Sequence, residues 1–278
     1  MLKNEPSFGR STSRLESSRD LPLRGNRLIL SLDLQSLKRS VKNNFKSLLI
    51  QGFFLISLLF ASSATGAEDA SEKSSFRYCG GWRGYHTDSK RIGTGTVVLI
   101  SPSWALTATH VARAKAQTPN KRRVELRFGP DKTVRVEKAF LAPKGDLALL
   151  KLQRPIKNVK PVSLLNQAVT KKDGVVPFTL VGHSGGLHFH RDRRAKGTGL
   201  HAKHITKKAD NPGKSGDSGG GWVIESHDKK EHVLFGIIHG GGRATQPAAV
   251  RKWIGDTMKA SGEKATWVDR PKPPKRKK

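Results

Sequence analysis

From about Thr94 onward, the chain alternates between short runs of β-branched and aliphatic residues and polar segments that contain glycine and proline. Apolar runs of this length, bounded by turn signals, are typical of strands in all-β domains. In the first half of this region we expect strands at 95–101, 104–107, 124–128, 133–141 and 147–152. Glycine and proline at 129–131 and 143–145 supply turns between them.

A second set of apolar runs follows a proline-containing connector at 153–161. We expect strands at 175–181, 221–225 and 232–238, with a polar stretch at 191–214. Val250, Trp253, Ile254 and Met258 then recur at the spacing of one helix face. The pattern predicts an all-β fold of two six-stranded antiparallel β-barrels with a C-terminal helix. We expect the domain at 94–262, preceded by an N-terminal segment at 68–93.

The first 67 residues have the composition of an export leader. Basic residues at 38–46 precede an apolar run at 48–60, and small residues follow, offering cleavage after Ala64 or Ala67. This order predicts a signal peptide within a leader at 1–67, and a secreted or periplasmic protein. The alternative is a membrane anchor formed by 48–60, but that run is shorter than the ~20 apolar residues that a bilayer requires.

The charge balance is strongly basic, with 52 Lys and Arg against 22 Asp and Glu and a formal net charge of +30. Such a charge predicts non-specific attraction to polyanions or anionic surfaces. The segment 263–278 has the composition of a basic disordered tail. Aromatic residues are too few for a base-stacking surface, so we expect no sequence-specific nucleic-acid recognition. The single cysteine, Cys79, excludes an intramolecular disulfide.

Three segments carry residues suited to nucleophilic catalysis. His110 follows an expected strand, Asp146 stands at the head of another, and Ser218 lies in the glycine-rich loop 213–220. A serine hydroxyl is a weak nucleophile until an imidazole takes its proton, and that imidazole needs a carboxylate to fix its tautomer. Glycines around the serine let backbone N–H groups converge on a developing oxyanion. Here those donors would be the amides of Gly216 and Ser218.

The segments 107–110, 146–150 and 216–220 resemble the three signature segments of the trypsin/chymotrypsin-like serine protease superfamily, and the similarity extends over about 95–261. The resemblance implies a double β-barrel with the site in the cleft between barrels. It also implies a secreted, monomeric endopeptidase that cleaves protein or peptide substrates through an acyl-enzyme, with His110, Asp146 and Ser218 as its triad. No cofactor and no metal are expected.

Two departures from the family pattern bear on activation and specificity. The usual Ile-Val-Gly-Gly activation sequence is absent, so Asp217 needs a partner other than a freed N-terminal ammonium, and we expect activity without proteolytic activation. The base of the specificity pocket falls at Pro212, where trypsin-like members carry an aspartate, so cleavage after Lys or Arg is not expected. Residues 236–241 resemble the strand that lines this pocket, with Gly241 and His239 as candidates. His239 either binds a substrate carboxylate, or it supports Asp146 or serves only in packing.

Two other functions remain open. Ser184 lies in a Gly-x-Ser-x-Gly segment after a strand, as in the nucleophile elbow of α/β-hydrolase esterases, and 239–242 mimics their oxyanion motif. The motif order and the strand-rich flanks oppose this reading, and we expect 182–186 to be a turn. The third possibility is a non-catalytic, basic polyanion-binding protein with a protease fold. Histidines at 183, 188 and 190 lack an ordered metal-ligand spacing.

Overall fold

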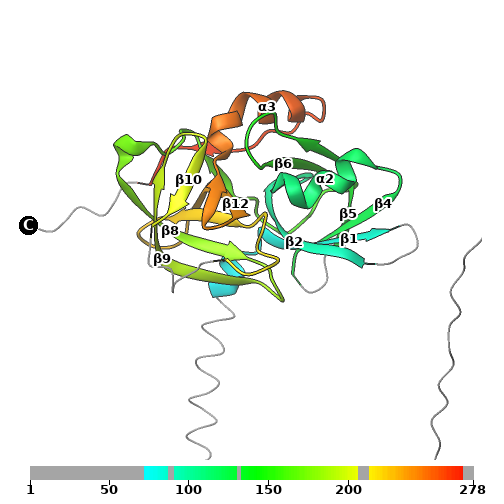
Figure 1. Ribbon diagram of the computed structural model, residues 1–278, viewed down its shortest axis with the longest axis horizontal. Helices are drawn as coiled ribbons and strands as arrows, with labels where there is room; N and C mark the ends of the chain where they lie inside the picture. The colour runs from blue at the N-terminus through cyan, green and yellow to red at the C-terminus, as the bar shows by residue number, and fades with distance from the viewer. Residues whose placement is uncertain (1–71, 87–90, 130–132, 206–212, 272–278) are drawn as a thin grey trace, which may run out of the picture. The chain divides into compact units, whose positions relative to one another are not determined.

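The computed structural model describes residues 72–86, 91–129, 133–205 and 213–271 (Figure 1). The leader at 1–67 with its apolar run at 48–60, Pro212, and the end of the tail at 272–278 lie outside these described residues. Among the helices that the structure describes, none is long and apolar enough to cross a membrane.

The first barrel is a closed sheet of six antiparallel strands in the order β1-β2-β3-β6-β5-β4. Its strands are β1 (Cys79–His86), β2 (Arg91–Ser101), β3 (Trp104–Thr107), β4 (Arg122–Arg127), β5 (Thr133–Leu141) and β6 (Ala148–Leu152). Helix α2 (Thr109–Gln117) connects β3 to β4. In β5, Val134 and Val136 are buried while the residues between and beside them are exposed, so the period-two pattern sets which face enters the core.

Strand β1 lies within the segment 68–93, and the barrel includes it, so the expected domain start at 94 is wrong. Three of its eight residues are glycines, which carry little strand propensity, and the sequence therefore gives no strand signal there. The tertiary structure requires one of these glycines to be small. A Cβ at Gly80 would lie 2.7 Å from the Phe128 ring. Pairing with β2 and β4, not local propensity, makes β1 a strand.

The second barrel closes in the order β11-β8-β9-β10-β13-β12, through the pairing of β11 with β12. Its strands are β8 (Val175–Gly182), β9 (His188–Gly197), β10 (His201–His204), β11 (Gly221–Glu225), β12 (His232–Gly240) and β13 (Arg243–Thr245). Short 3-10 turns η1 (Lys171–Asp173) and η3 (Pro247–Val250) flank it. The prediction of two six-stranded antiparallel barrels is confirmed.

The polar stretch at 191–214 contains most of β9 and all of β10. In the C-terminal part of β9 only Ala195 and Gly197 are fully buried, while Arg194 and Lys196 face solvent. Two small buried residues among charged ones leave too weak a hydrophobic pattern to predict a strand. Backbone pairing with β8 on one side and β10 on the other makes this segment a strand.

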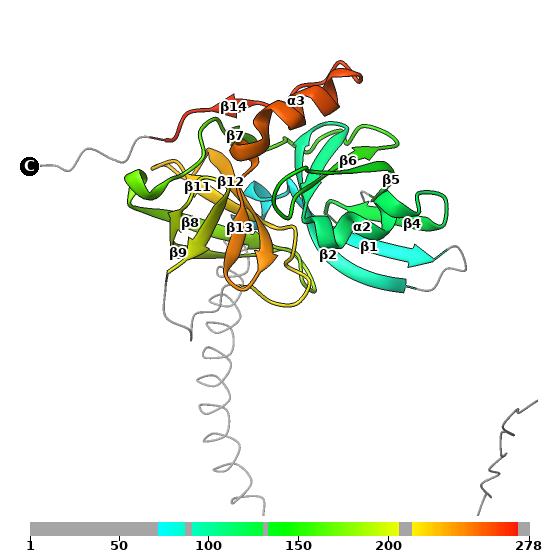
Figure 2. The same ribbon diagram turned by 45° about the horizontal axis from the view of Figure 1, so that its top comes forward.

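The C-terminal helix α3 (Arg251–Lys259) buries Ile254 and Met258, which confirms the helix predicted from their spacing. Beyond it the described chain stays ordered, because β14 (Trp267–Val268) pairs in parallel with β7 (Ser163–Leu165), and β7 in turn pairs with β12 (Figure 2). The expected start of the disordered tail at residue 263 therefore lies too early in the sequence. Glu263 belongs to the fold, since it accepts hydrogen bonds from the Ser101 hydroxyl and the Ser103 backbone N–H.

Candidate active site

His110 is the second residue of helix α2, and Asp146 binds it twice. The Nδ1 of His110 lies 2.6 Å from Oδ2 of Asp146, and the His110 backbone N–H donates to Oδ1 at 3.0 Å. The first N–H groups of a helix lack partners within the helix, and Ala108 at the N-cap offers no side-chain acceptor. Oδ1 of Asp146 therefore caps the helix, while Oδ2 orients the imidazole.

Asp146 is held by the second barrel as well. Its backbone N–H donates to the Thr245 hydroxyl of β13 at 3.1 Å. The preceding Gly145 has φ +73, and a Cβ there would lie 2.6 Å from Thr245, so this turn requires glycine. Burial raises the pKa of Asp146, but hydrogen bonds from the His110 side chain and backbone outweigh burial and hold the pKa below its ordinary value. Asp146 is thus ionised at neutral pH.

Ser218 lies on the loop before β11, and this loop is pinned to the first barrel. The Thr96 backbone N–H donates to the Ser218 carbonyl at 2.8 Å, and the Thr96 hydroxyl donates to the Gly216 carbonyl at 2.8 Å. A Cβ at Gly95 would lie 2.8 Å from Val111, which follows His110, and 3.3 Å from the Ser218 carbonyl. Only glycine at position 95 therefore fits between Val111 of α2 and the Ser218 backbone.

The backbone amides around Ser218 divide into two groups. The N–H groups of Asp217, Gly219 and Gly220 donate to carbonyls of Lys214, Ile238 and Asp217. Within the described residues, the amides of Gly216 and Ser218 donate to no protein acceptor. The Ser218 hydroxyl makes no hydrogen bond to His110 there, and such contacts are often long in the absence of substrate. Two unused donors beside a serine are available to a ligand.

Comparison with protein-family models matches the description Trypsin over residues 82–254, more than half of the chain. The chain belongs to the trypsin family. The matched range begins within β1, consistent with a first barrel that starts ahead of residue 94. A search of the curated proteins gives no match.

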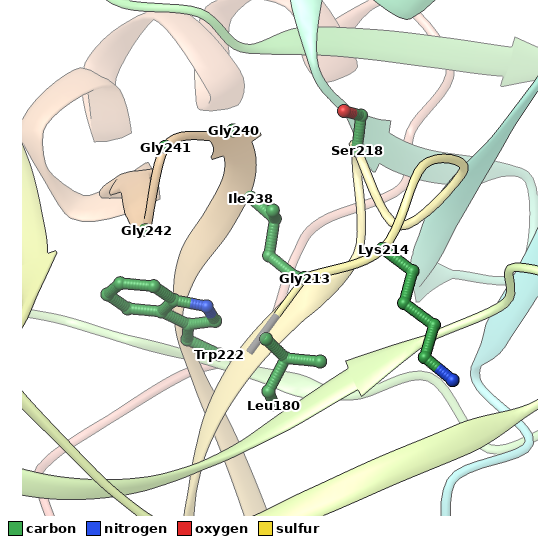
Figure 3. A pocket seen from close by; sticks show the side chains of 9 residues that line it. All are labelled: Leu180, Gly213, Lys214, Ser218, Trp222, Ile238, Gly240, Gly241 and Gly242. Atoms are coloured by element: carbon green, nitrogen blue, oxygen red, sulfur yellow. The ribbon is translucent and has the colours of Figure 1, made fainter. Parts of the chain in front are cut away.

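In this trypsin-family chain, a small cavity of about 80 Å³ opens beside Ser218 (Figure 3). Leu180, Trp222 and Ile238 supply its apolar walls, and the glycines at 240–242, Gly241 among them, form its edge. Figure 3 shows the Lys214 side chain pointing away from these apolar groups. No carboxylate lines the described part of this cavity.

His239 is not among the residues that line the cavity. Its charge interacts with Asp146, and its ring meets the His201 ring edge-on at 5.5 Å between centroids. Burial lowers the pKa of His239, which favours the neutral imidazole, although the Asp146 charge opposes the shift. The structure therefore packs His239 against His201, outside the described lining of the cavity.

Ser184 lies in the turn between antiparallel strands β8 and β9, not at a strand-to-helix elbow. Its hydroxyl is buried and has no hydrogen-bond partner in the described structure. Its backbone N–H donates to Asp217. Ser184 thus supports the loop that carries Ser218.

Two threonines that position the site were missed by sequence reasoning. Thr96 holds the Ser218 and Gly216 carbonyls, and Thr245 holds the Asp146 amide. Both are fully buried. No local signal marks them, because each contacts a residue far away in the chain. Thr245 and Asp146 are 99 positions apart, and Thr96 and Gly216 are 120 positions apart. In the described parts of the chain, no group of three or more His, Cys, Asp or Glu side chains is arranged to hold a metal.

Proposed function

We propose that this chain is a serine endopeptidase in which Ser218 is the nucleophile, His110 the general base and Asp146 the residue that orients His110. The observation that carries the proposal is the double contact of Asp146 with His110. It leaves the proton on Nδ1 and the lone pair on Nε2, the tautomer that accepts a proton from a hydroxyl. Membership of the trypsin family supports the peptidase reading.

In the proposed reaction, the Ser218 oxygen attacks the carbonyl carbon of the scissile peptide bond while its proton passes to Nε2 of His110. The carbonyl oxygen becomes negative and accepts hydrogen bonds from the unused amides of Gly216 and Ser218. As the C–N bond breaks, His110 returns the proton to the leaving amine, and an acyl-enzyme on Ser218 remains. Water then attacks the ester, giving its proton to His110, and the acid product leaves as the serine recovers that proton.

The cavity beside Ser218 would take the side chain on the acyl side of the scissile bond. Its ~80 Å³ is smaller than the roughly 150 Å³ cavity that accommodates benzene in an engineered protein core. Its apolar walls and the absence of a carboxylate in the described lining give a cationic side chain no partner. We therefore expect small apolar residues, such as alanine or valine, at this position.

Export through the leader at 1–67 and weak, salt-sensitive binding to anionic surfaces are part of the proposal. The leader has the charge and hydrophobicity order of a signal peptide, and the net charge of +30 supports attraction to polyanions.

The test compares wild type with Ser218→Ala and the matched Ser184→Ala for fluorophosphonate labelling and casein cleavage. We expect Ser218→Ala to abolish both signals and Ser184→Ala to retain labelling, because the Ser184 hydroxyl is buried in a turn between two antiparallel strands. Loss of labelling in Ser184→Ala alone would establish the esterase alternative. A wild type that neither labels nor cleaves, yet binds polyanions, would establish the non-catalytic scaffold.

A further inference from the structure

Asp217, which precedes Ser218, is the buried centre of the loop that carries the nucleophile. Its side chain is 1% exposed. Oδ2 accepts the Lys214 backbone N–H at 2.8 Å, and Oδ1 accepts the Ser184 backbone N–H at 3.2 Å. The carboxylate thus ties together both ends of the loop 214–217 and the turn after β8. A buried carboxylate of this kind is stable only with a cationic partner or further donors.

His188, at the start of β9, supplies that partner. Its Nε2 lies 3.1 Å from Oδ1 and 3.2 Å from Oδ2 of Asp217, and its Nδ1 lies 3.0 Å from the Gly186 carbonyl oxygen. Both ring nitrogens therefore face acceptors. A neutral imidazole has one N–H, and only the imidazolium has two, so the protonated ring alone satisfies both contacts. The hydrogen bond to Asp217 raises the pKa of His188, although burial opposes the shift.

The other titratable groups near this pair do not replace His188. Lys214, His183 and His190 interact with the His188 cation unfavourably, and the His190 ring lies edge-on at 5.6 Å. Burial and then the Asp217 charge raise the pKa of the Cys79 thiol, which keeps it neutral. Among the described residues, His188 is the one side-chain cation within ion-pair distance of Asp217.

The position of His188 is fixed by its neighbours in β9. The adjacent Phe189 stacks on Phe76 with 4.9 Å between ring centroids, and the Arg191 guanidinium lies 4.8 Å from the Phe189 ring. Arg191 also pairs with Glu225 at 3.1 Å and Glu72 at 3.0 Å. Phe76 and Glu72, which precede β1, thus hold Phe189 and Arg191 of β9 in place, while His188 contacts Asp217.

We propose that protonated His188 is a positioning residue of the active site. Its ion pair with Asp217 holds the loop 213–218 in the shape that presents Ser218 and the Gly216 amide, so that the site forms without an N-terminal ammonium released by proteolysis. The inference rests on the proposed function. It extends that function by making activity depend on the charge of a histidine outside the triad.

The direction of the pH dependence follows from the raised pKa. His188 gains its partner on folding, so its contribution is fully present below the ordinary histidine pKa of about 6.5 and is lost as pH rises through the higher folded value. Above that value the carboxylate of Asp217 keeps its two backbone donors but loses its counter-ion. The loop then relaxes, and the activity falls on the alkaline side.

The experiment measures kcat and KM against pH for wild type, His188→Gln, His188→Lys and the control His190→Gln. We expect His188→Gln to lose at least about tenfold in kcat with a smaller change in KM, because a displaced oxyanion donor typically costs about 10²–10³ in rate. His188→Lys should keep most of the activity and move the alkaline limb to higher pH, since a lysine holds its proton longer. His190→Gln should follow wild type.

An alkaline limb that is the same in wild type and His188→Lys would overturn the inference, as would full activity of His188→Gln at all pH values. If His188→Gln fails to fold, as judged by thermal unfolding, the position of the limb in His188→Lys decides alone. Failure of the proposed function looks different, because a wild type without Ser218-dependent labelling at any pH refutes the protease itself. A labelling wild type with unaffected His188 variants refutes only this inference.

Discussion

Replacing Asp146 by asparagine tests the geometry of the candidate site most directly. The asparagine retains an oxygen that accepts the His110 backbone N–H, the contact that measures 3.0 Å. It places an NH₂ group opposite Nδ1, where the carboxylate oxygen lies at 2.6 Å. Two donors cannot face each other, so the ring changes tautomer and carries its proton on Nε2. His110 then has no lone pair for the Ser218 proton.

The expected loss of kcat in Asp146→Asn is about 10⁴-fold, the size that the same substitution causes in a serine-protease triad, and it equals roughly 5.5 kcal/mol in activation free energy. The effect on folding is expected to be much smaller. His110 is 45% exposed and solvent screens its interaction with Asp146, so we expect about 1 kcal/mol or less in the free energy of unfolding. The cap of α2 is preserved by the remaining oxygen.

The assay is the steady-state hydrolysis of a peptide ester, together with thermal unfolding. Asp173→Asn is the matched control, because Asp173 also accepts hydrogen bonds from a backbone N–H and a hydroxyl, those of Thr170, but lies outside the site. An Asp146→Asn variant that keeps its activity within tenfold of wild type would refute the role assigned to the Asp146–His110 contact. A variant that unfolds well below the control would contradict the small stability cost expected for the exposed Asp146–His110 pair.

Two further predictions concern the Ser218 loop and the cavity beside it. Gly219→Ala should destabilise the protein by more than about 2 kcal/mol and abolish activity, because φ is +89 and the new Cβ would overlap the Thr107 hydroxyl. Chemical denaturation measures the free energy of unfolding, with Gly213→Ala as the control, since no described atom lies within 4 Å of a Cβ at position 213. Equal stability of the two variants would contradict the prediction. Peptides with alanine or valine on the acyl side of the scissile bond should exceed matched lysine peptides at least tenfold in kcat/KM, because Trp222 and Ile238 line a small apolar cavity. A preference for lysine in a peptide-library digest would show that this cavity does not receive that side chain.

Elements with a strong local pattern could be predicted from the sequence. The strands β2, β3 and β6 of the first barrel are nearly continuous apolar runs, β4 and β5 alternate with a period of two, and helix α3 has helical spacing of apolar residues. Strand β1 could not be predicted in this way, because its three glycines have little strand propensity and Gly80 is required by the close approach of Phe128. Strand β9 was missed because its buried positions are small and its exposed ones charged.

The sequence by itself determined the residue types of the candidate site, since His110, Asp146 and Ser218 each stand in a short segment whose neighbours suit the same chemistry. It also showed that Asp217 lacks the partner usual in the family. Only the tertiary structure decided that this partner is His188, that Thr245 anchors Asp146, and that His239 packs against His201. These contacts join residues 29 to 99 positions apart, and hydrogen bonds at such separations depend on how the two barrels close, which no local pattern encodes.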